Sequence, residues 1–159
     1  LTSRTSAPGE EVNELAAALK RLLADQITMY LKAHGFHWNV EGPMFVQFHD
    51  FFSSIYEDVY GSIDPTAENI RKLREYAPFG IGTIDKLREI EDSKVSTDPI
   101  AMCVDLLDAN TKILECIHEA SDLAEAMDEE GIMNFLAERD DMHKKWRWQL
   151  ESTIKMTRA

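Results

Sequence analysis

Several features are scarce in this 159-residue sequence, and each scarcity narrows what the protein can be. There are only two cysteines, Cys103 and Cys116, and they lie more than three turns apart in one predicted helix, where a disulfide cannot form. We therefore expect free thiols in a reducing compartment. No apolar run is long enough to cross a bilayer, and the first residues lack the basic and then apolar pattern of a secretory signal. These absences predict a cytoplasmic protein without a membrane span.

Basic residues are also scarce. The sequence has 17 Lys and Arg against 29 Asp and Glu, for a net charge of −12, and neither end carries a basic cluster. Because binding to phosphates relies on Lys and Arg, we expect no strong DNA binding at physiological salt. An acidic surface attracts cations, although the same charge can serve simply to keep a protein in solution.

Glycine and proline are few, and apolar residues recur at helical spacing along most of the chain. This pattern predicts four long helices, at about residues 10–37, 43–76, 98–126 and 130–156. A short helix is expected within TIDKLREI, residues 83–90, in the connection between the second and third. There is no strand-like alternation and no repeat. The predicted fold class is all-α, a ferritin-like four-helix bundle with a short extra helix in its long crossover.

The length fits one domain, residues 1–159, with residues 1–9 as a short N-terminal tail. Bundles of this kind often hold metal in their interior, with Glu-x-x-His on two helices. Glu115 and His118 have that spacing, but they face away from the apolar stripe of their helix, so we interpret them as surface residues. His143 follows Asp140 at the same spacing and is better explained as a hydrogen-bonded core or interface histidine.

The second helix carries a different set of ligand types, because His49, Asp64 and Glu68 share roughly one helical face. Asp64 and Glu68 are four residues apart and can face one ion together. His49 and Asp64 are fifteen residues apart, roughly 22 Å along a helix, whereas metal–ligand bonds are about 2 Å. One chain therefore cannot bring both to one metal.

Two antiparallel copies of this helix can do so if a two-fold axis passes near Tyr56 or Glu57. His49 of one copy then approaches Asp64 and Glu68 of the other, and His37 at the end of the first helix completes the imidazole set. The residues alone leave an alternative open, in which the carboxylates form a solvated face and the histidines pack in the core.

The residues that carry this pattern form a recognisable signature. HWNVEGP at residues 37–43, then Phe45 and His49, and later Asp64-x-x-Ala67-Glu68 resemble the Dps family, the small ferritin-like proteins named for DNA protection during starvation. The length and the helix order resemble that family across nearly the whole chain.

The resemblance implies a homo-oligomer, a hollow shell of twelve subunits with an iron oxidation site at each two-fold interface. It implies oxidation of Fe(II), typically by hydrogen peroxide and otherwise by oxygen, with storage of the ferric product as a mineral inside. Carried over by position, His37 and His49 come from one chain and Asp64 and Glu68 from its mate. Trp38 would lie beside the ligands or supply electrons to stray oxidising equivalents; a role as a large core residue explains it equally well.

Two positions depart from the family pattern. Ser53 stands where the family usually has Asp or Glu, four residues after the second histidine. A neutral hydroxyl is a poor iron ligand, so we expect one firm metal position and one weak one, with Glu57 a candidate replacement ligand. Pro65 follows Asp64 directly, and a proline inside a helix clashes with the carbonyl four residues back, here that of Gly61. A kink between Gly61 and Pro65 is therefore predicted.

These departures leave three functions to compare. The favoured one is an iron-storing ferroxidase that protects against oxidative damage. The alternative is a shell that sequesters a metal such as zinc, which also competes for His and carboxylate ligands, with weak ferroxidase turnover because of Ser53. A DNA-compacting structural protein is least favoured because of the charge. The acidic segments 128–130 and 138–141 either line an iron entry pore or form a solvated face, and the latter is preferred.

Overall fold

The computed structural model describes the backbone of residues 8–158 and the side chains of residues 14–155. All regular secondary structure in this described part is helical. In chain order the helices are α1 (Pro8–Asn39), α2 (Phe45–Lys72), α3 (Ile81–Leu87), α4 (Pro99–Ala126) and α5 (Glu130–Arg158). Residues 1–7 of the predicted N-terminal tail lie outside the described part, and α1 already begins at Pro8.

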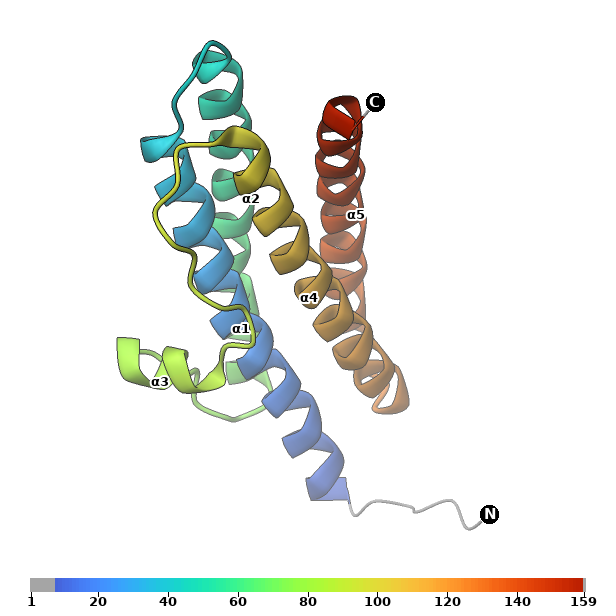
Figure 1. Ribbon diagram of the computed structural model, residues 1–159. Coiled ribbons are helices and arrows are strands. Elements are labelled where there is room, and N and C mark those ends of the chain that lie inside the picture. Colours follow the sequence, from blue (N-terminus) through green and yellow to red (C-terminus); the bar gives the residue numbers. More distant parts are fainter. Residues whose placement is uncertain (1–7, 159) are drawn as a thin grey trace.

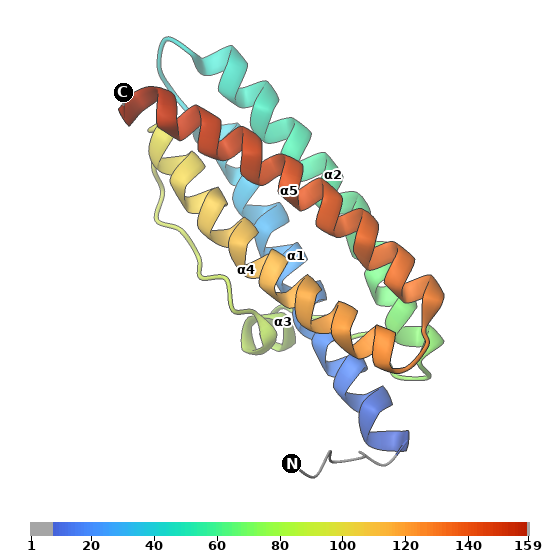
Figure 2. The same cartoon turned by 90° about the vertical axis from the view of Figure 1, so that its right-hand side faces the viewer.

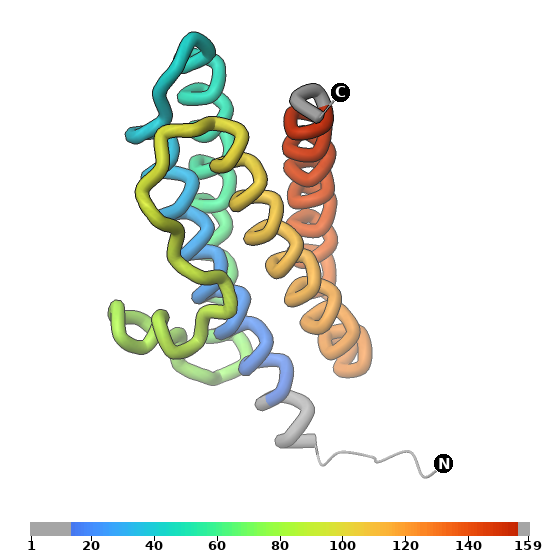
Figure 3. The backbone as a smooth tube through the Cα atoms, viewed as in Figure 1, coloured from blue at the N-terminus to red at the C-terminus, as the bar shows by residue number. Residues whose placement is uncertain are grey.

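The four long helices form a bundle in which each packs against two neighbours. α1 contacts α2 and α4, and α5 contacts α4 and α2, so α1 lies diagonally opposite α5. Figures 1 and 2 show the four lying side by side along one common direction. Between α2 and α4 the chain runs back along the bundle beside α1, with α3 at the start of this crossover (Figure 3). The predicted all-α bundle of four long helices, with a short extra helix in its crossover, is confirmed.

The helices arise from apolar stripes that meet in one core. On α2, for example, the buried positions recur at intervals of three and four residues: Phe52, Ile55, Val59, Ser62, Thr66, Asn69 and Ile70. This spacing places them on the face that packs against the other helices. The buried apolar side chains of all four long helices join one cluster, and Ile90 of the crossover is part of it.

Two helix ends differ from the predicted ones for identifiable reasons. α2 was predicted to continue to residue 76 but ends at Lys72, because Arg74 takes a left-handed backbone conformation with φ of 67°. The Arg74 amide donates to the Arg71 carbonyl at 2.9 Å and so closes the last turn. α3 begins at Ile81, after Gly80 at φ of 93°, a conformation that glycine adopts without strain.

The start of α4 follows the predicted capping pattern. The Asp98 carboxylate accepts a hydrogen bond from the Ala101 amide at 3.1 Å, and Pro99 occupies the first turn, where its missing N–H costs nothing. Both cysteines, Cys103 and Cys116, are free, as predicted, and the structure buries them, which raises the pKa of each thiol to about 12. No helix within residues 8–158 has the length and apolarity needed to cross a membrane.

Candidate metal centre

The two histidines of the signature meet where α1 ends and α2 begins. His37 lies in the last turn of α1 and His49 in the second turn of α2, and both side chains are half-buried. Their imidazole rings stack with centroids 3.6 Å apart and planes 18° apart. Nδ1 of His37 lies 2.7 Å from the His49 carbonyl oxygen, and Nδ1 of His49 lies 2.7 Å from the His37 carbonyl oxygen.

This reciprocal pairing fixes the neutral tautomer of both rings. A carbonyl oxygen can only accept, so each Nδ1 must carry the hydrogen and donate it. Each neutral ring therefore keeps its lone pair on Nε2, the arrangement found in metal-binding histidines whose other nitrogen donates to a backbone carbonyl. In this tautomer the two rings offer their Nε2 atoms as the potential metal donors.

The stacking also separates the two donors. A metal ion bound to an imidazole lies in the ring plane, about 2 Å from the nitrogen. The two rings are stacked, with centroids 3.6 Å apart and planes inclined by only 18°, so their planes do not converge on one point at that distance. Metal ions bound by His37 and His49 would therefore occupy two neighbouring positions, one at each ring.

Asp64 and Glu68 are exposed on α2, about four turns after His49. Across the residues that the structure describes, no three His, Cys, Asp or Glu side chains gather closely enough to hold a metal ion. A single chain thus presents the imidazoles at one end of α2 and the carboxylates towards the other, in agreement with the predicted separation of His49 and Asp64 along the helix.

Ser53 lies one helical turn after His49, and its hydroxyl is engaged in a hydrogen bond within α2. Its hydroxyl donates to Oε1 of Glu57 at 3.3 Å, so the hydroxyl and the predicted replacement ligand are bonded to each other. The half-site next to His49 therefore contains a neutral hydroxyl, with a carboxylate one turn beyond it.

An aromatic layer, formed by Tyr30, His34, Trp38 and Tyr56, lies beside His37, whose ring centroid is 5.2 Å from that of Tyr56. Trp38 is 64% exposed, so it is not a core residue of the chain, and its ring lies 4.3 Å from that of His34. His34 stacks on Tyr56 at 4.0 Å and lies 3.0 Å from the Tyr30 hydroxyl through Nδ1. Partial burial and the nearby His37 lower the pKa of His34. Helical periodicity in the sequence did not reveal the tyrosine partners of His34.

The helix continues through Pro65. Proline has no N–H to donate to the Gly61 carbonyl, but Gly61 is exposed and water can replace the missing donor. The Thr66 hydroxyl donates to the Ser62 carbonyl at 2.8 Å on the buried side. An unbroken helix does not exclude a change of axis direction, so the kink between Gly61 and Pro65 stays a prediction.

The other histidine motifs are structural, as predicted. The side chain of His118 is 66% exposed, and its Nε2 lies 3.4 Å from Asp140. His143 is fully buried: its Nδ1 donates to the Asn110 amide oxygen at 2.8 Å, and its Nε2 accepts from Arg139 at 3.0 Å. Burial, reinforced by the charge of Arg139, lowers the pKa of His143 to about 3.

Sequence reasoning missed the ion pair that completes this network. Arg139 of α5 donates through both terminal nitrogens to the Asp58 carboxylate of α2, each at 2.9 Å, and Trp146 Nε1 donates to the same group at 2.8 Å. Burial opposes the charge on Asp58, but the bonds and charge of Arg139 outweigh it and hold the pKa of Asp58 below its ordinary value. The available signal was Arg139 itself, a charged residue inside the apolar stripe that runs through Leu136 and Trp146.

Comparison with known proteins shows the family to which this chain belongs. A family model for a ferritin-like domain matches residues 16–159. The chain belongs to the ferritin-like family.

Its relatives include several Dps proteins. The chain is 25% identical over 140 residues to the DNA protection during starvation protein of Brevibacillus brevis, covering 88% of this chain and 94% of the relative. It is 28% identical over 137 residues to the Helicobacter pylori protein of the same name, covering 86% and 95%. The crystal structure of the Vibrio cholerae O1 Dps protein, described as a ferritin-like diiron-carboxylate protein, matches with a TM-score of 0.89 at 26% identity over 96% of each chain. The resemblance to the Dps family is thus confirmed.

Proposed function

We propose that this protein is an iron-storing ferroxidase that oxidises Fe(II) with hydrogen peroxide at sites between subunits and protects against oxidative damage. Its ferritin-like, diiron-carboxylate relatives support iron storage and protection from oxidative stress as the general role. Fe(II) is the substrate, and the ferric product is the cargo of a hollow shell. Each protomer acts as one ferritin-like domain, and the shell is cytoplasmic.

The observation that carries the proposal is the reciprocal bonding of His37 and His49. It directs Nδ1 of each stacked ring to a carbonyl and leaves Nε2 as the potential metal donor, at one end of a helix whose other part carries Asp64 and Glu68. Imidazole binds iron, and the carboxylates favour the harder Fe(III) product. Two neighbouring ions can each give one electron to a peroxide molecule, so that water forms without release of hydroxyl radical.

A second copy of the chain would complete the site. His37 and His49 of one protomer would meet Asp64 and Glu68 of the two-fold mate, and the mate's histidines would form the second, equivalent site. Exposed apolar side chains near α1 and α3 are available for contacts between subunits: Leu31, Phe79 and Ile81 are 59%, 87% and 92% exposed. They line a groove of about 650 Å³ between these helices. The proposed assembly is a dodecamer.

Stopped-flow measurement of Fe(II) oxidation tests the function. With the purified shell we expect hydrogen peroxide to oxidise Fe(II) faster than oxygen does, and Zn(II) to compete because it accepts the same ligands. Asp64→Asn combined with Glu68→Gln should abolish the fast phase, because the amides carry no charge for Fe(III). The matched control is Asp50→Asn with Glu41→Gln, which removes equal charge at two exposed positions outside the site. Equal rates in both double variants would contradict the proposal.

A second candidate function is favoured by Ser53. Its hydroxyl donates a hydrogen bond to Glu57, so the position beside His49 lacks a free carboxylate. Such a position suits zinc, which has no redox chemistry and so needs no carboxylate to favour a ferric product. Such a shell would sequester zinc with little ferroxidase turnover. The same stopped-flow assay separates the two, since a zinc store would bind Zn(II) tightly and oxidise Fe(II) no faster than the double variant does.

A further inference from the structure

One tyrosine of the aromatic layer is paired with a base. The Tyr30 hydroxyl lies 3.0 Å from Nδ1 of His34, four residues along α1. The side chains described here include four tyrosines, and Tyr30 is the one whose hydroxyl has a side-chain hydrogen-bond partner. Oxidation of a phenol by one electron releases its proton, and His34 can accept it at Nδ1 when its ring carries the hydrogen on Nε2, so Tyr30 is the tyrosine best placed for oxidation.

The same tyrosine is linked to the histidine pair by a run of ring contacts. Ring centroids lie 5.5 Å apart from Tyr30 to His34, 4.0 Å from His34 to Tyr56, and 5.2 Å from Tyr56 to His37. On its other side, Tyr30 lies 5.1 Å from Tyr60, which is 61% exposed. Neighbouring rings at these distances let an electron move from Tyr30 to the metal centre in short steps.

An electron from Tyr30 would be needed if the metal position beside His49 and Ser53 were empty. Reduction of one peroxide molecule to water takes two electrons, and one Fe(II) ion supplies one. Ser53 removes a carboxylate from the position beside His49, so a site holding a single Fe(II) lacks the second electron. Without another donor, the product of one-electron reduction would be hydroxyl radical.

We infer that Tyr30 is a redox-active residue that supplies this second electron, with Nδ1 of His34 taking the phenol proton. The inference rests on the proposed ferroxidase function for its oxidant. One peroxide, one Fe(II), the Tyr30 phenol, neutral His34 and two solvent protons yield Fe(III), two waters, a Tyr30 phenoxyl radical and protonated His34. The peroxide O–O bond breaks, Fe(II) and Tyr30 each lose one electron, and peroxide gains both.

Trp38 is the competing donor on this face. Its ring lies 4.3 Å from His34, but it is 64% exposed, and none of the described residues accepts its indole N–H. The pairing of Tyr30 with His34 therefore favours the phenol over the indole as the site where the radical rests.

Rapid-freeze electron paramagnetic resonance tests the inference on the assembled protein, loaded with Fe(II) and mixed with hydrogen peroxide. The wild type should give a tyrosyl signal, and Tyr30→Phe, which keeps the ring and its packing, should lose it. His34→Gln keeps a hydrogen-bond acceptor but removes the base, and should slow radical formation by about tenfold or more. Tyr76→Phe is the matched control: Tyr76 is 82% exposed in the crossover, outside this run of rings, and the signal should be unchanged.

A tyrosyl signal that survives Tyr30→Phe, an indole radical in place of a tyrosyl one, or Fe(II) oxidation with no radical would each overturn the inference. A metal-free experiment separates this from failure of the ferroxidase function. Flash-generated ruthenium(III) tris-bipyridine oxidises the apo-protein directly, and the wild type should form the tyrosyl radical faster than His34→Gln. If peroxide does not oxidise Fe(II) at all, the proposed function fails, and the flash experiment alone decides: equal rates in the two proteins would reject the Tyr30–His34 pair.

Discussion

The hydroxyl of Ser53 concerns a single residue, but it sets how many metal ions the site should bind. It lies one turn after His49 and donates to Glu57, so the position beside His49 has an imidazole but no free carboxylate nearby. His37 and His49 face separate positions because their rings are stacked, and His37 cannot make up for the loss. Metal binding at the position beside His49 is therefore predicted to depend on the side chain at residue 53.

Replacing that side chain should restore the second position. We expect Ser53→Asp to raise Fe(II) or Zn(II) stoichiometry from one to two ions per half of the interface, because a carboxylate is a charged ligand in reach of the ion at His49. Titration calorimetry and anomalous diffraction measure this. The matched control is Ser54→Asp, which adds the same charge one residue on, where the side chain is exposed and points elsewhere. Two equally occupied positions in the wild type would contradict the prediction.

His143 shows at the same scale how burial controls a charge. Its pKa is about 3 in the folded protein against 6.5 for the free side chain, because it is buried beside Arg139. A folded-state pKa that is depressed means that the unfolded state binds the proton first. The stabilisation is therefore fully present above pH 6.5 and is lost as the pH falls towards 3.

Thermal unfolding across this range provides the check. Between pH 6.5 and 4 we expect His143 to make the unfolding free energy fall by at most about 1.4 kcal/mol per pH unit. In His143→Gln the melting temperature should be lower at neutral pH but should depend less steeply on pH. His118→Gln, at an exposed histidine on α4, should keep the wild-type dependence. Parallel curves for wild type and His143→Gln would show that the buried histidine does not cause the loss.

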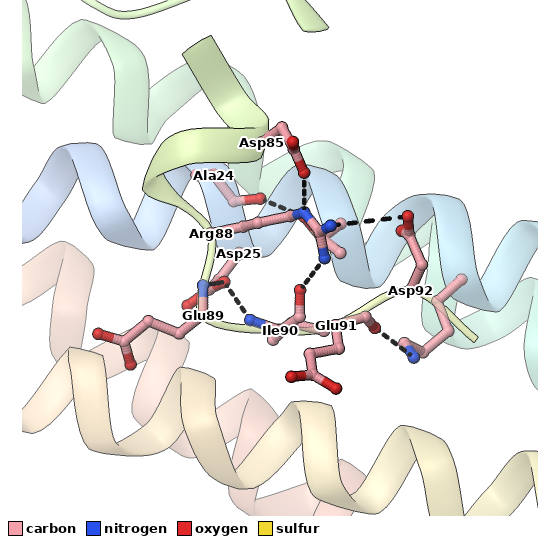
Figure 4. Close-up of polar contacts among 10 residues, drawn as sticks. Ala24, Asp25, Asp85, Arg88, Glu89, Ile90, Glu91 and Asp92 are labelled. Atoms are coloured by element: carbon pink, nitrogen blue, oxygen red, sulfur yellow. Dashed lines mark hydrogen bonds and ion pairs between the residues drawn. The ribbon is translucent and has the colours of Figure 1, made fainter. Parts of the chain in front are cut away.

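At the scale of an element, the crossover between α2 and α4 is held to α1 by two buried charged side chains. The Asp25 carboxylate accepts from the backbone amides of Glu89 and Ile90 at 2.8 and 3.0 Å (Figure 4). Lys32, with a side-chain exposure of 4%, donates to the Glu91 carbonyl at 3.0 Å and pairs with Asp105 at 2.8 Å. These bonds position a segment that has only one short helix of its own.

Removing one of these attachments should loosen the crossover specifically. Asp25→Ala leaves two amides without their acceptor, and an unsatisfied buried donor costs about 1–3 kcal/mol, so we expect the melting temperature to fall by several degrees. Hydrogen exchange should accelerate at the amides of Glu89 and Ile90. Asp92→Ala is the matched control, because its carboxylate is 85% exposed and makes only a 3.6 Å contact with Arg88. Unchanged exchange in Asp25→Ala would rule out this role.

At the scale of the whole molecule, the candidate site is divided between two ends of α2. The histidines lie where α1 meets α2, and the carboxylates lie about four turns further on. Under the proposed two-fold assembly, a site takes its histidines from one protomer and its carboxylates from the mate. Two chains that are each inactive should then rescue each other.

Co-assembly of two variants measures this directly. One variant carries His37→Ala and His49→Ala, and the other carries Asp64→Asn and Glu68→Gln. In a random mixture, half the two-fold pairs are mixed and each mixed pair has one intact site, so roughly a quarter of the wild-type peroxide-dependent rate should return. Mixing without subunit exchange is the control and should return none. No recovery in verified mixed shells would mean that the four residues do not share an interface site.

Features that depend on residues close together in the sequence could be predicted, whereas features that depend on contacts between distant residues could not. Helix positions follow from apolar periodicity, a local property, and the long helices differ from the predicted ones mostly by a few residues at their ends. The larger error, at the end of α2, comes from the left-handed conformation of Arg74, which periodicity does not encode. The outward placement of His118 and the inward placement of His143 followed from the same helical geometry.

The sequence by itself determined the bundle, the ligand types, and the fact that His49 and Asp64 cannot meet within one chain, because helical rise fixes the distance between residues on one helix. Only the tertiary structure decided which imidazole nitrogens are free, since the acceptors for His37 and His49 are each other's backbone carbonyls on two different helices. It alone revealed the Tyr30 and His34 pair beside Tyr56. Hydrogen bonds depend on placement to within a few tenths of an ångström, and periodicity specifies only the face of a helix.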